Sequence, residues 1–465
     1  MSTFSQNYTI VDLVESNRAE IIDLERWAFP SQISRDEMLA GPDPIDYRRT
    51  AGIRFSDSGQ PSVMQTTNSS DSGQPSATQA TNSSDNGQPS VMQGDTDGQL
   101  VAMRSSFAWE RFPVPGGTAP VAGLTMVSVH PEHRRRGLLN TMIDEHFSRC
   151  AARKEAFSVL VATEPVIYGR YGYGRAADSF SLTLNRGAAL RSVEGSEDIR
   201  VRIFDLNPAI HAQLIDELHR AVAYKGRLSR PGWATRDTQS LRERIVFEYQ
   251  ANLQGSEEFR LMLAEHDGKP VGYALFNRND TWKNWSDEGP NLTVDVREYA
   301  ASDGAATHAL WSRLLDMDLT TKVKINPLSV DDPLLTMLVA VEPTQNHFGE
   351  LLWVRLIDLP QALKARQYAS DVDVVLEVTD TRLAANQGRW RLTATAFNSD
   401  VQVERTDADP VICLDIRELG AIYLGGTSLA ALAAAGLVKV TCPKALIKTA
   451  AAFHWPIAPG CSWHF

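Results

Sequence analysis

Three consecutive arginines followed by a glycine have the clearest chemical meaning in this chain. Arg134, Arg135, Arg136 and Gly137 lie between a hydrophobic run at 123–129 and an amphipathic run that follows them. Guanidinium groups bind phosphate well, and glycine allows the backbone to approach a ligand closely. A turn that opens a helix also presents unpaired N–H groups and a partial positive charge. The pattern therefore indicates a pyrophosphate site.

The runs on either side must form a strand and a helix to position such a site. Residues 123–129 alternate apolar and small side chains as a half-buried strand does, and Pro131 ends the run. One helical face then collects Leu139, Met142, Ile143 and Phe147. We therefore expect backbone donors from about 135 to 139, Leu138 among them, to hold phosphates, with Arg134 adding charge. The alternative is a solvated basic run before a helix.

A second strand beside the first would complete a cofactor slot. Residues 157–163 are short, apolar and rich in β-branched side chains, and Thr163 ends them. Parallel strands that splay apart leave a groove, and the tyrosines of an aromatic hook at 167–174 follow it directly. The phenol of Tyr168 would lie near the slot, protonated at neutral pH because its ordinary pKa is about 10. Alternatively, Tyr168, like Tyr171 and Tyr173, is a packing residue.

Together these motifs resemble a known family. The GNAT signature is Arg or Gln, two residues, Gly, one residue, then Gly or Ala; Arg134, Gly137 and Leu139 stand at these places, and Leu139 departs from the small final residue. Residues 133–139 and the hook are similar to the enhanced intracellular survival family of GNAT N-acetyltransferases. Further segments agree over nearly the whole chain except 56–99: Ser-Arg-Pro-Gly-Trp at 229–233, Trp-Val-Arg-Leu at 353–356, Leu-Gly-Ala-Ile-Tyr-Leu-Gly-Gly at 419–426, and the final Phe465.

The resemblance implies a co-substrate and the site residues. It implies acetyl-CoA, with Val127 and Val129 offering backbone groups to it, Tyr168 as general acid and the carboxylate of Phe465 as general base. A free α-carboxyl has a pKa of about 3.3 to 3.7, which is low for a base, so partial burial or a water would be needed. Neighbouring His464 is the rival base because its intrinsic pKa is better suited.

Fold class and domains are expected as follows. The resemblance implies α/β and α+β structure, with two tandem GNAT-like domains and a sterol-carrier-protein-like domain. We expect a catalytic first unit at 1–189, a degenerate second unit at 190–351, and a third unit at 352–465 with the catalytic tail. A repeat of 14 residues in 56–99, rich in Ser, Asn, Gln and Gly, predicts a disordered insertion.

The second unit lacks the arginine cluster. At its strand-to-helix junction stand Glu298, Tyr299, Ser302, Asp303 and Gly304. Carboxylates there would repel a pyrophosphate. We therefore expect the second unit not to bind CoA.

Composition excludes several classes of protein. The net charge of −11 argues against a nucleic-acid binder. The chain has no signal-peptide pattern and no apolar run long enough to span a bilayer, so we expect a cytoplasmic protein without membrane contact. Its four cysteines are scattered without metal-ligand spacing, so we expect no metal. The resemblance implies a homohexamer.

Three functions remain open. The first is an N-acetyltransferase of cationic small molecules, with aminoglycosides, acetylated at several positions, as the substrates that the resemblance implies. The second is a protein lysine acetyltransferase, and the third is a noncatalytic carrier or scaffold. The phosphate turn and the hook favour the first two. The sequence does not separate them, because residues of the helix near Glu25 and Trp27 that would line the acceptor pocket cannot be positioned from it.

Overall fold

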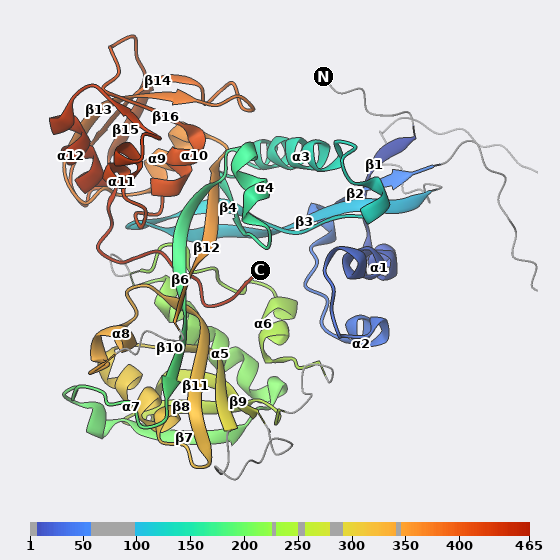
Figure 1. The fold of residues 1–465 in the computed structure, drawn as a ribbon, viewed down its shortest axis with the longest axis vertical. Coiled ribbons are helices and arrows are strands. Elements are labelled where there is room, and N and C mark those ends of the chain that lie inside the picture. Colours follow the sequence, from blue (N-terminus) through green and yellow to red (C-terminus); the bar gives the residue numbers. More distant parts are fainter. Residues whose placement is uncertain (1–6, 57–97, 226–228, 250–255, 280–291, 341–345) are drawn as a thin grey trace, which may run out of the picture.

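The computed structural model describes residues 7–56, 98–225, 229–249, 256–279, 292–340 and 346–465 (Figure 1). Almost all of the repeat insertion at 56–99 lies outside the described residues. Within them, the strands form a twelve-stranded sheet, shared by the first and second units, and a five-stranded sheet in the third unit. No helix in these ranges is long and apolar enough to cross a membrane.

The first unit builds its half of the large sheet from an antiparallel series followed by a parallel crossover. Its elements are β1 (Tyr8–Asp12), α1 (Arg18–Ala28), α2 (Arg35–Ala40), β2 (Ala51–Phe55), β3 (Gln99–Val114), β4 (Gly117–Val129), α3 (Leu138–Ala152), β5 (Phe157–Val161) and the short α4 (Pro165–Tyr168). The strand expected before the arginines is confirmed, and the strand after α3 ends at Val161 rather than at the expected Thr163.

A groove opens between β4 and β5 because the two strands pair over a short distance only. Their parallel register covers 121–123 against 157–159. Beyond Gly123 and Val159 the strands diverge. This is the splayed slot that the two hydrophobic runs predict.

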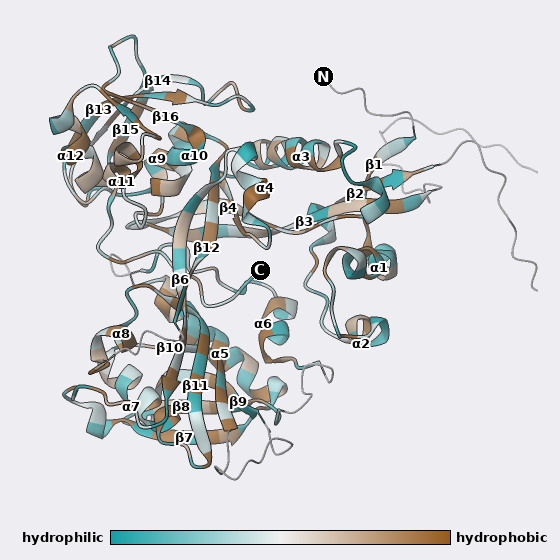
Figure 2. Ribbon diagram, viewed as in Figure 1, coloured by the Kyte–Doolittle hydropathy of each residue, from teal (hydrophilic) through white to brown (hydrophobic). Residues whose placement is uncertain are grey.

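The second unit repeats this order of elements. It contains β7 (Arg200–Asp205), α5 (Pro208–Ala223), α6 (Gln239–Val246), β8 (Arg260–His266), β9 (Lys269–Asn279), β10 (Leu292–Ala301), α7 (Gly304–Leu315), β11 (Thr320–Ser329) and α8 (Pro333–Met337). The hairpin of β8 and β9 turns at Asp267 and Gly268, whose φ angles are 49° and 73°. As with β4 and β5, the strands β10 and β11 are parallel and joined through a helix. Hydrophobic and hydrophilic residues alternate along β11, which packs one face on the core (Figure 2).

Two strands join the first two units into one sheet. They are β6 (Gly174–Asn185) and β12 (His347–Leu356). β12 pairs with β5 on one side and β6 on the other, and β6 pairs in turn with β11. The proposed boundary between the second and third units, at 351/352, therefore falls within a strand of the shared sheet.

The third unit packs helices against its own sheet. It contains α9 (Leu359–Ala365), β13 (Val372–Thr379), β14 (Gly388–Ala394), β15 (Val401–Arg405), β16 (Ile412–Asp415), α10 (Ile416–Ile422), α11 (Leu429–Ala434), β17 (Lys439–Val440) and α12 (Pro443–Phe453). α10 lies so close to the large sheet that a Cβ on Gly174 or Gly420 would collide with backbone. After α12 the chain returns between the first two units, where it ends (Figure 1).

Candidate active site

The arginine turn lies between β4 and α3, as the sequence predicts. Gly137 caps α3 with a left-handed φ of 81°, and Arg135 has a φ of 61°. Space beside Gly137 is open, so backbone conformation rather than crowding accounts for glycine there. The residues that open the helix line a cavity of about 630 Å³.

All the cofactor residues expected from the sequence line this one cavity: Val127, Val129, Arg134, Arg135, Gly137, Leu138 and Thr163. Arg136 does not line it, because its guanidinium donates to the Tyr8 hydroxyl at 2.8 Å. The third arginine of the run thus braces the turn against β1, while the side chains of Arg134 and Arg135 are exposed beside the cavity. Exposed guanidinium groups next to a helix N-terminus fit a diphosphate.

A bulge in β4 prepares its backbone for a ligand. The register with β3 shifts between Met103 and Ser105, and Met126 on β4 has a φ of 54°. A bulge releases backbone groups from the ladder, here near Met126 and Val127. These groups lie at the splay of β4 and β5, where a cofactor arm would pass.

A second cavity, of about 400 Å³, adjoins the first. Four residues line both: Phe29, Val127, Thr163 and Tyr168. The second cavity also contains His464 and Phe465 from the end of the chain. Tyr168 therefore lies at the junction between a cavity suited to a cofactor and one that the C-terminus reaches.

The three tyrosines of the hook differ in their surroundings. Tyr171 and Tyr173 are buried, and their hydroxyls bond to Asn140 at 2.9 Å and to Ser158 at 2.8 Å. Tyr173 is therefore a packing residue, whereas Tyr171 is buried but also lines the first cavity. The Tyr168 hydroxyl has no hydrogen-bond partner among the described residues. Burial, followed by the neighbouring Tyr171, raises the pKa of Tyr168 to about 12, so this phenol keeps its proton at neutral pH.

The hook is supported from behind by β12. Gly172 has a φ of 82°, and a Cβ there would contact the Arg355 side chain. Arg355 is fully buried and bonds both carboxylate oxygens of Asp380 at 2.8 Å. The segment 353–356 therefore couples the hook to the third unit.

The C-terminal residue is held by aromatic rings. Phe465 is 8% exposed, and its ring centroid lies 5.0 Å from that of Trp109 and 5.5 Å from that of Trp463. The rival base, His464, lines the same cavity, and burial lowers the pKa of its imidazole. The structure thus places both candidate bases in the second cavity.

Glu25 is a second acidic side chain of that cavity. Asp43, also in the cavity, pairs with Arg18 at 3.3 Å, whereas no described residue bonds to the Glu25 carboxylate. Burial raises the pKa of Glu25 to about 7, against an opposing effect of Arg244. Trp27 lines neither cavity; it is 63% exposed and packs on His130 at 5.3 Å. Helical spacing predicts α1 but does not tell which of its polar residues faces a cavity.

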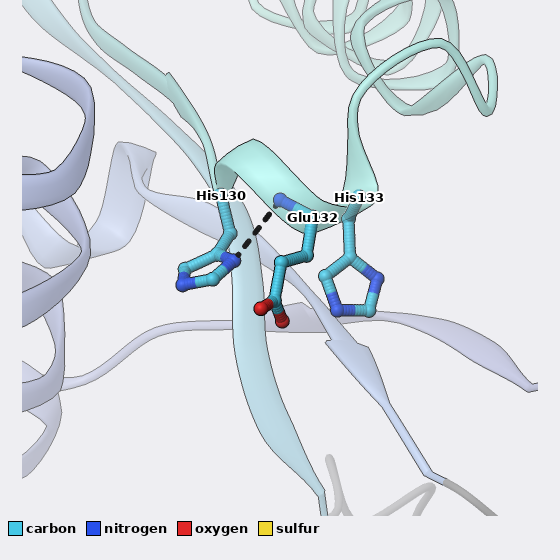
Figure 3. Close-up of side chains that lie close together, drawn as sticks. All are labelled: His130, Glu132 and His133. Atoms are coloured by element: carbon cyan, nitrogen blue, oxygen red, sulfur yellow. Dashed lines mark hydrogen bonds between the residues drawn. The ribbon is translucent and has the colours of Figure 1, made fainter.

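One group of described side chains has metal-ligand spacing. The nearest ligand atoms of His130, Glu132 and His133 lie within 4.8 Å of one another (Figure 3). Nδ1 of His133 already bonds the Tyr8 hydroxyl at 2.9 Å, and Nδ1 of His130 accepts the Glu132 N–H at 3.4 Å. A cation here would also meet the arginines that follow at once. We therefore assign these side chains to shaping the turn.

Three segments of the chain match known domain families. Acetyltransferase (GNAT) domain families match residues 71–176 and 226–356, and the sterol carrier protein domain family matches residues 359–462. An uncharacterized N-acetyltransferase of Streptomyces avermitilis is 36% identical over 357 residues, covering 75% of this chain and 83% of the relative. N-acetyltransferase Eis of Mycobacterium tuberculosis is 31% identical over 358 residues, covering 74% and 80%.

The same architecture occurs in solved structures. Eis1 of Mycobacterium abscessus superposes with a TM-score of 0.73 at 25% identity, covering 98% of this chain and 100% of that one. A GCN5-related N-acetyltransferase of Anabaena variabilis has a TM-score of 0.72 at 17% identity, with the same coverage, and shows the fold alone. The chain therefore belongs to the Eis-like family of N-acetyltransferases, which combine two GNAT domains with a sterol-carrier-like domain.

Proposed function

We propose that the first cavity binds acetyl-CoA and the second binds an acceptor amine, with acetyl transfer at their junction. The observation that carries this proposal is Tyr168, which lines both cavities while the end of the chain lines the second. In this proposal Tyr168 is the general acid and the Phe465 carboxylate is the general base. Membership of a GNAT family implies acetyl-CoA.

The cofactor residues divide by chemistry. Arg134 and Arg135 supply charge to the diphosphate, and the N–H groups from Gly137 to Leu138 supply hydrogen bonds at the start of α3. Val127 and Val129 offer backbone groups to the pantetheine arm, and Thr163 closes the slot on the β5 side. No role for a metal is proposed.

Acetyl transfer requires one group that accepts a proton from the amine and one that donates to the departing sulfur. An amine is an ammonium ion at neutral pH and must lose a proton before it attacks a thioester. The Phe465 carboxylate takes that proton, directly or through water. The departing sulfur gains negative charge, and the Tyr168 hydroxyl donates to it. Because its pKa of about 12 exceeds the value of about 8.5 for an ordinary thiol, Tyr168 stabilises the departing thiolate as a hydrogen-bond donor and keeps its own proton. The second proton that the nitrogen loses as the amide forms balances the proton that the sulfur gains.

Charge in the second cavity supports a cationic acceptor. The Glu25 carboxylate forms no hydrogen bond with a described residue, although Arg244 lines the same cavity, and the Phe465 carboxylate adds a second negative charge. We propose small polyamines of the aminoglycoside type, acetylated at more than one position. A flexible molecule with several amino groups can present each in turn to one fixed base.

The test is release of thiol from acetyl-CoA with a panel of amines. The panel contains aminoglycosides, linear polyamines and lysine peptides. Turnover with several aminoglycosides and none with peptides is expected. Turnover restricted to peptides would favour a protein lysine acetyltransferase, and absence of thiol release with every amine would favour a noncatalytic carrier.

Assembly and location are proposed from the family resemblance. A hexamer of two trimers in the cytoplasm is expected. Sedimentation velocity measures the mass of the particle, and cell fractionation measures its location. A monomeric profile across the micromolar range would contradict the assembly.

A further inference from the structure

The second unit has a splayed slot of its own, and the end of the chain lies beside it. Parallel pairing of β10 with β11 stops at Val296 and Ile325. As in β4, a bulge follows, here between Val296 and Glu298 in the register with β9. A small cavity of about 250 Å³ at this splay is lined by Arg297, Asn326 and Pro327 from the strands and by residues 462–464 of the tail.

Glu298 stands at this splay, completely buried and surrounded by donors. Its carboxylate accepts hydrogen bonds from the Arg236 guanidinium and the Tyr273 hydroxyl. The Ser462 hydroxyl donates to the same carboxylate at 2.7 Å. A buried carboxylate requires such donors, since an unpaired charge would be costly. One donor comes from the tail.

His219 completes the contact with the tail. Ser462 has one proton, which it gives to Glu298, so Nε2 of His219, 2.9 Å from the Ser462 oxygen, must be the donor of that bond. Burial and then Arg236 hold the pKa of His219 well below its usual range, so the ring is neutral with its proton on Nε2. The ring of His219 also stacks on Trp233 at 4.9 Å.

The segment around Trp233 holds the tail backbone. Pro231 accepts the N–H of Gly460 at 2.9 Å, and Ala234 accepts the indole N–H of Trp463 at 2.8 Å. Arg230 donates to the carbonyl of Ala458 at 2.7 Å. The motif at 229–233 thus lies along the tail and not at the cofactor cavity.

We propose that the second unit uses its cofactor-type slot as a clamp for the C-terminal tail, with Glu298 as the positioning residue that sets the place of Phe465. The carboxylate that would repel a pyrophosphate instead anchors Ser462, three residues before the proposed base. This inference rests on the proposed function for the part of Phe465 in turnover, but the clamp itself can be measured without catalysis.

The experiment follows removal of Phe465 by a carboxypeptidase, read by mass spectrometry, alongside steady-state kinetics. Ser462→Ala removes the tail donor and leaves the Arg236–Glu298 pair intact, so it remains informative if Glu298→Gln fails to fold. The matched control is Glu217→Gln on the exposed face of α5. Each clamp variant should lose Phe465 about tenfold faster or more, as expected for losing a hydrogen bond to a charged group. Turnover should fall by a similar factor, with an unchanged KM for acetyl-CoA.

The outcomes separate the clamp from the proposed function. Wild-type resistance to the protease in a folded Ser462→Ala variant would overturn the clamp. Faster digestion with undiminished turnover, in Ser462→Ala and also after deletion of Phe465, would retain the clamp and remove Phe465 from the mechanism. A lower affinity for acetyl-CoA in place of lower turnover would overturn the positioning role of Glu298.

Discussion

Tyr168 and Phe465 line the same cavity, although one belongs to the hook after β5 and the other is the last residue of the chain. The first GNAT domain therefore contains the cofactor turn and the proposed acid but not the proposed base. Residues of the second domain hold the tail by hydrogen bonds. The tail itself is the end of the third unit, which is connected to the large sheet through β12. All three units contribute to one site.

The proposed mechanism requires a free α-carboxylate on Phe465. A tag appended after Phe465 removes its α-carboxylate and adds bulk in a cavity of about 400 Å³. Turnover should fall by about 10²-fold or more, as for loss of a proton-transfer group, while acetyl-CoA still binds. An N-terminal tag is the control and should leave turnover unchanged. Full activity of a C-terminally tagged enzyme, shown to be intact by mass spectrometry, would transfer the role of base to His464 or a water.

Replacing Tyr168 by Phe removes one oxygen at the junction of the two cavities. The Tyr168 hydroxyl has no hydrogen-bond partner among the described residues, so its removal should cost little stability. Turnover should drop by about 10² or more at an unchanged Kd for acetyl-CoA. The matched variant is Tyr173→Phe, whose hydroxyl bonds Ser158 in the core. Tyr173→Phe should change the melting temperature more than the turnover. If Tyr173→Phe lowered turnover strongly and Tyr168→Phe did not, Tyr168 would be excluded as the acid.

Local patterns in the sequence predict the strand, the arginine turn and the helix well because these parts are contiguous. Strand, turn, left-handed Gly137 and helix all lie within about thirty residues, and each has a short-range signal. The hook is similar: its glycines and tyrosines show a tight turn, although only the structure separates Tyr168 from its two packed neighbours.

The tail contacts could not be derived from local patterns. Glu298 and Ser462 lie far apart in the chain, and each alone is an ordinary polar residue. The sequence predicts that Glu298 is unsuited to a pyrophosphate site, but the bond of Glu298 to the tail depends on a return of the chain after α12. The short helix α10 likewise packs closely on β6 and β12, which lie far from it in the sequence or in another unit.

Arg134 and Arg136 should differ in their effect on cofactor binding. Arg134 lines the cofactor cavity, whereas Arg136 bonds Tyr8. Arg134→Ala should weaken acetyl-CoA binding by about 1 to 3 kcal/mol, the range for a charged hydrogen bond, with little change in turnover at saturation. Arg136→Ala should affect melting temperature more than affinity. Calorimetric titration measures the affinity of both variants for acetyl-CoA. Equal losses of affinity would mean that net charge, and not the position of each arginine, determines cofactor binding.

Removal of metal should leave the enzyme unchanged. His130, Glu132 and His133 have ligand spacing, but two ring nitrogens already have hydrogen bonds. Dialysis against a chelator should alter neither turnover nor melting temperature, and elemental analysis of the purified protein should find less than one equivalent of metal. A stoichiometric metal whose removal lowers acetyl-CoA binding would contradict the structural role given to this group.

Glu25 should make stability and substrate affinity depend on pH. Its pKa of about 7 in the folded protein lies above the ordinary 4.5, so between these values the folded state holds a proton that the unfolded chain has lost. Stability therefore falls as pH rises from about 4.5 to 7 and then levels off. Glu25→Gln removes this loss. The variant should gain on the order of 1 to 3 kcal/mol over the wild type at pH 8, seen as a higher melting temperature, with no gain at pH 4.

The same carboxylate should bind the acceptor in its charged form. KM for a cationic amine should decrease in the wild type as pH rises from 6 to 8, because Glu25 becomes charged. Glu25→Gln should have a higher KM, and its KM should lack the decrease that comes from the titration of Glu25. Turnover at saturating amine should be less affected, because Phe465 supplies the base. The surface variant Glu217→Gln should follow the wild type in both measurements. If Glu25→Gln instead abolishes turnover at every amine concentration while removal of Phe465 does not, Glu25 is the base and the C-terminal carboxylate only binds the acceptor.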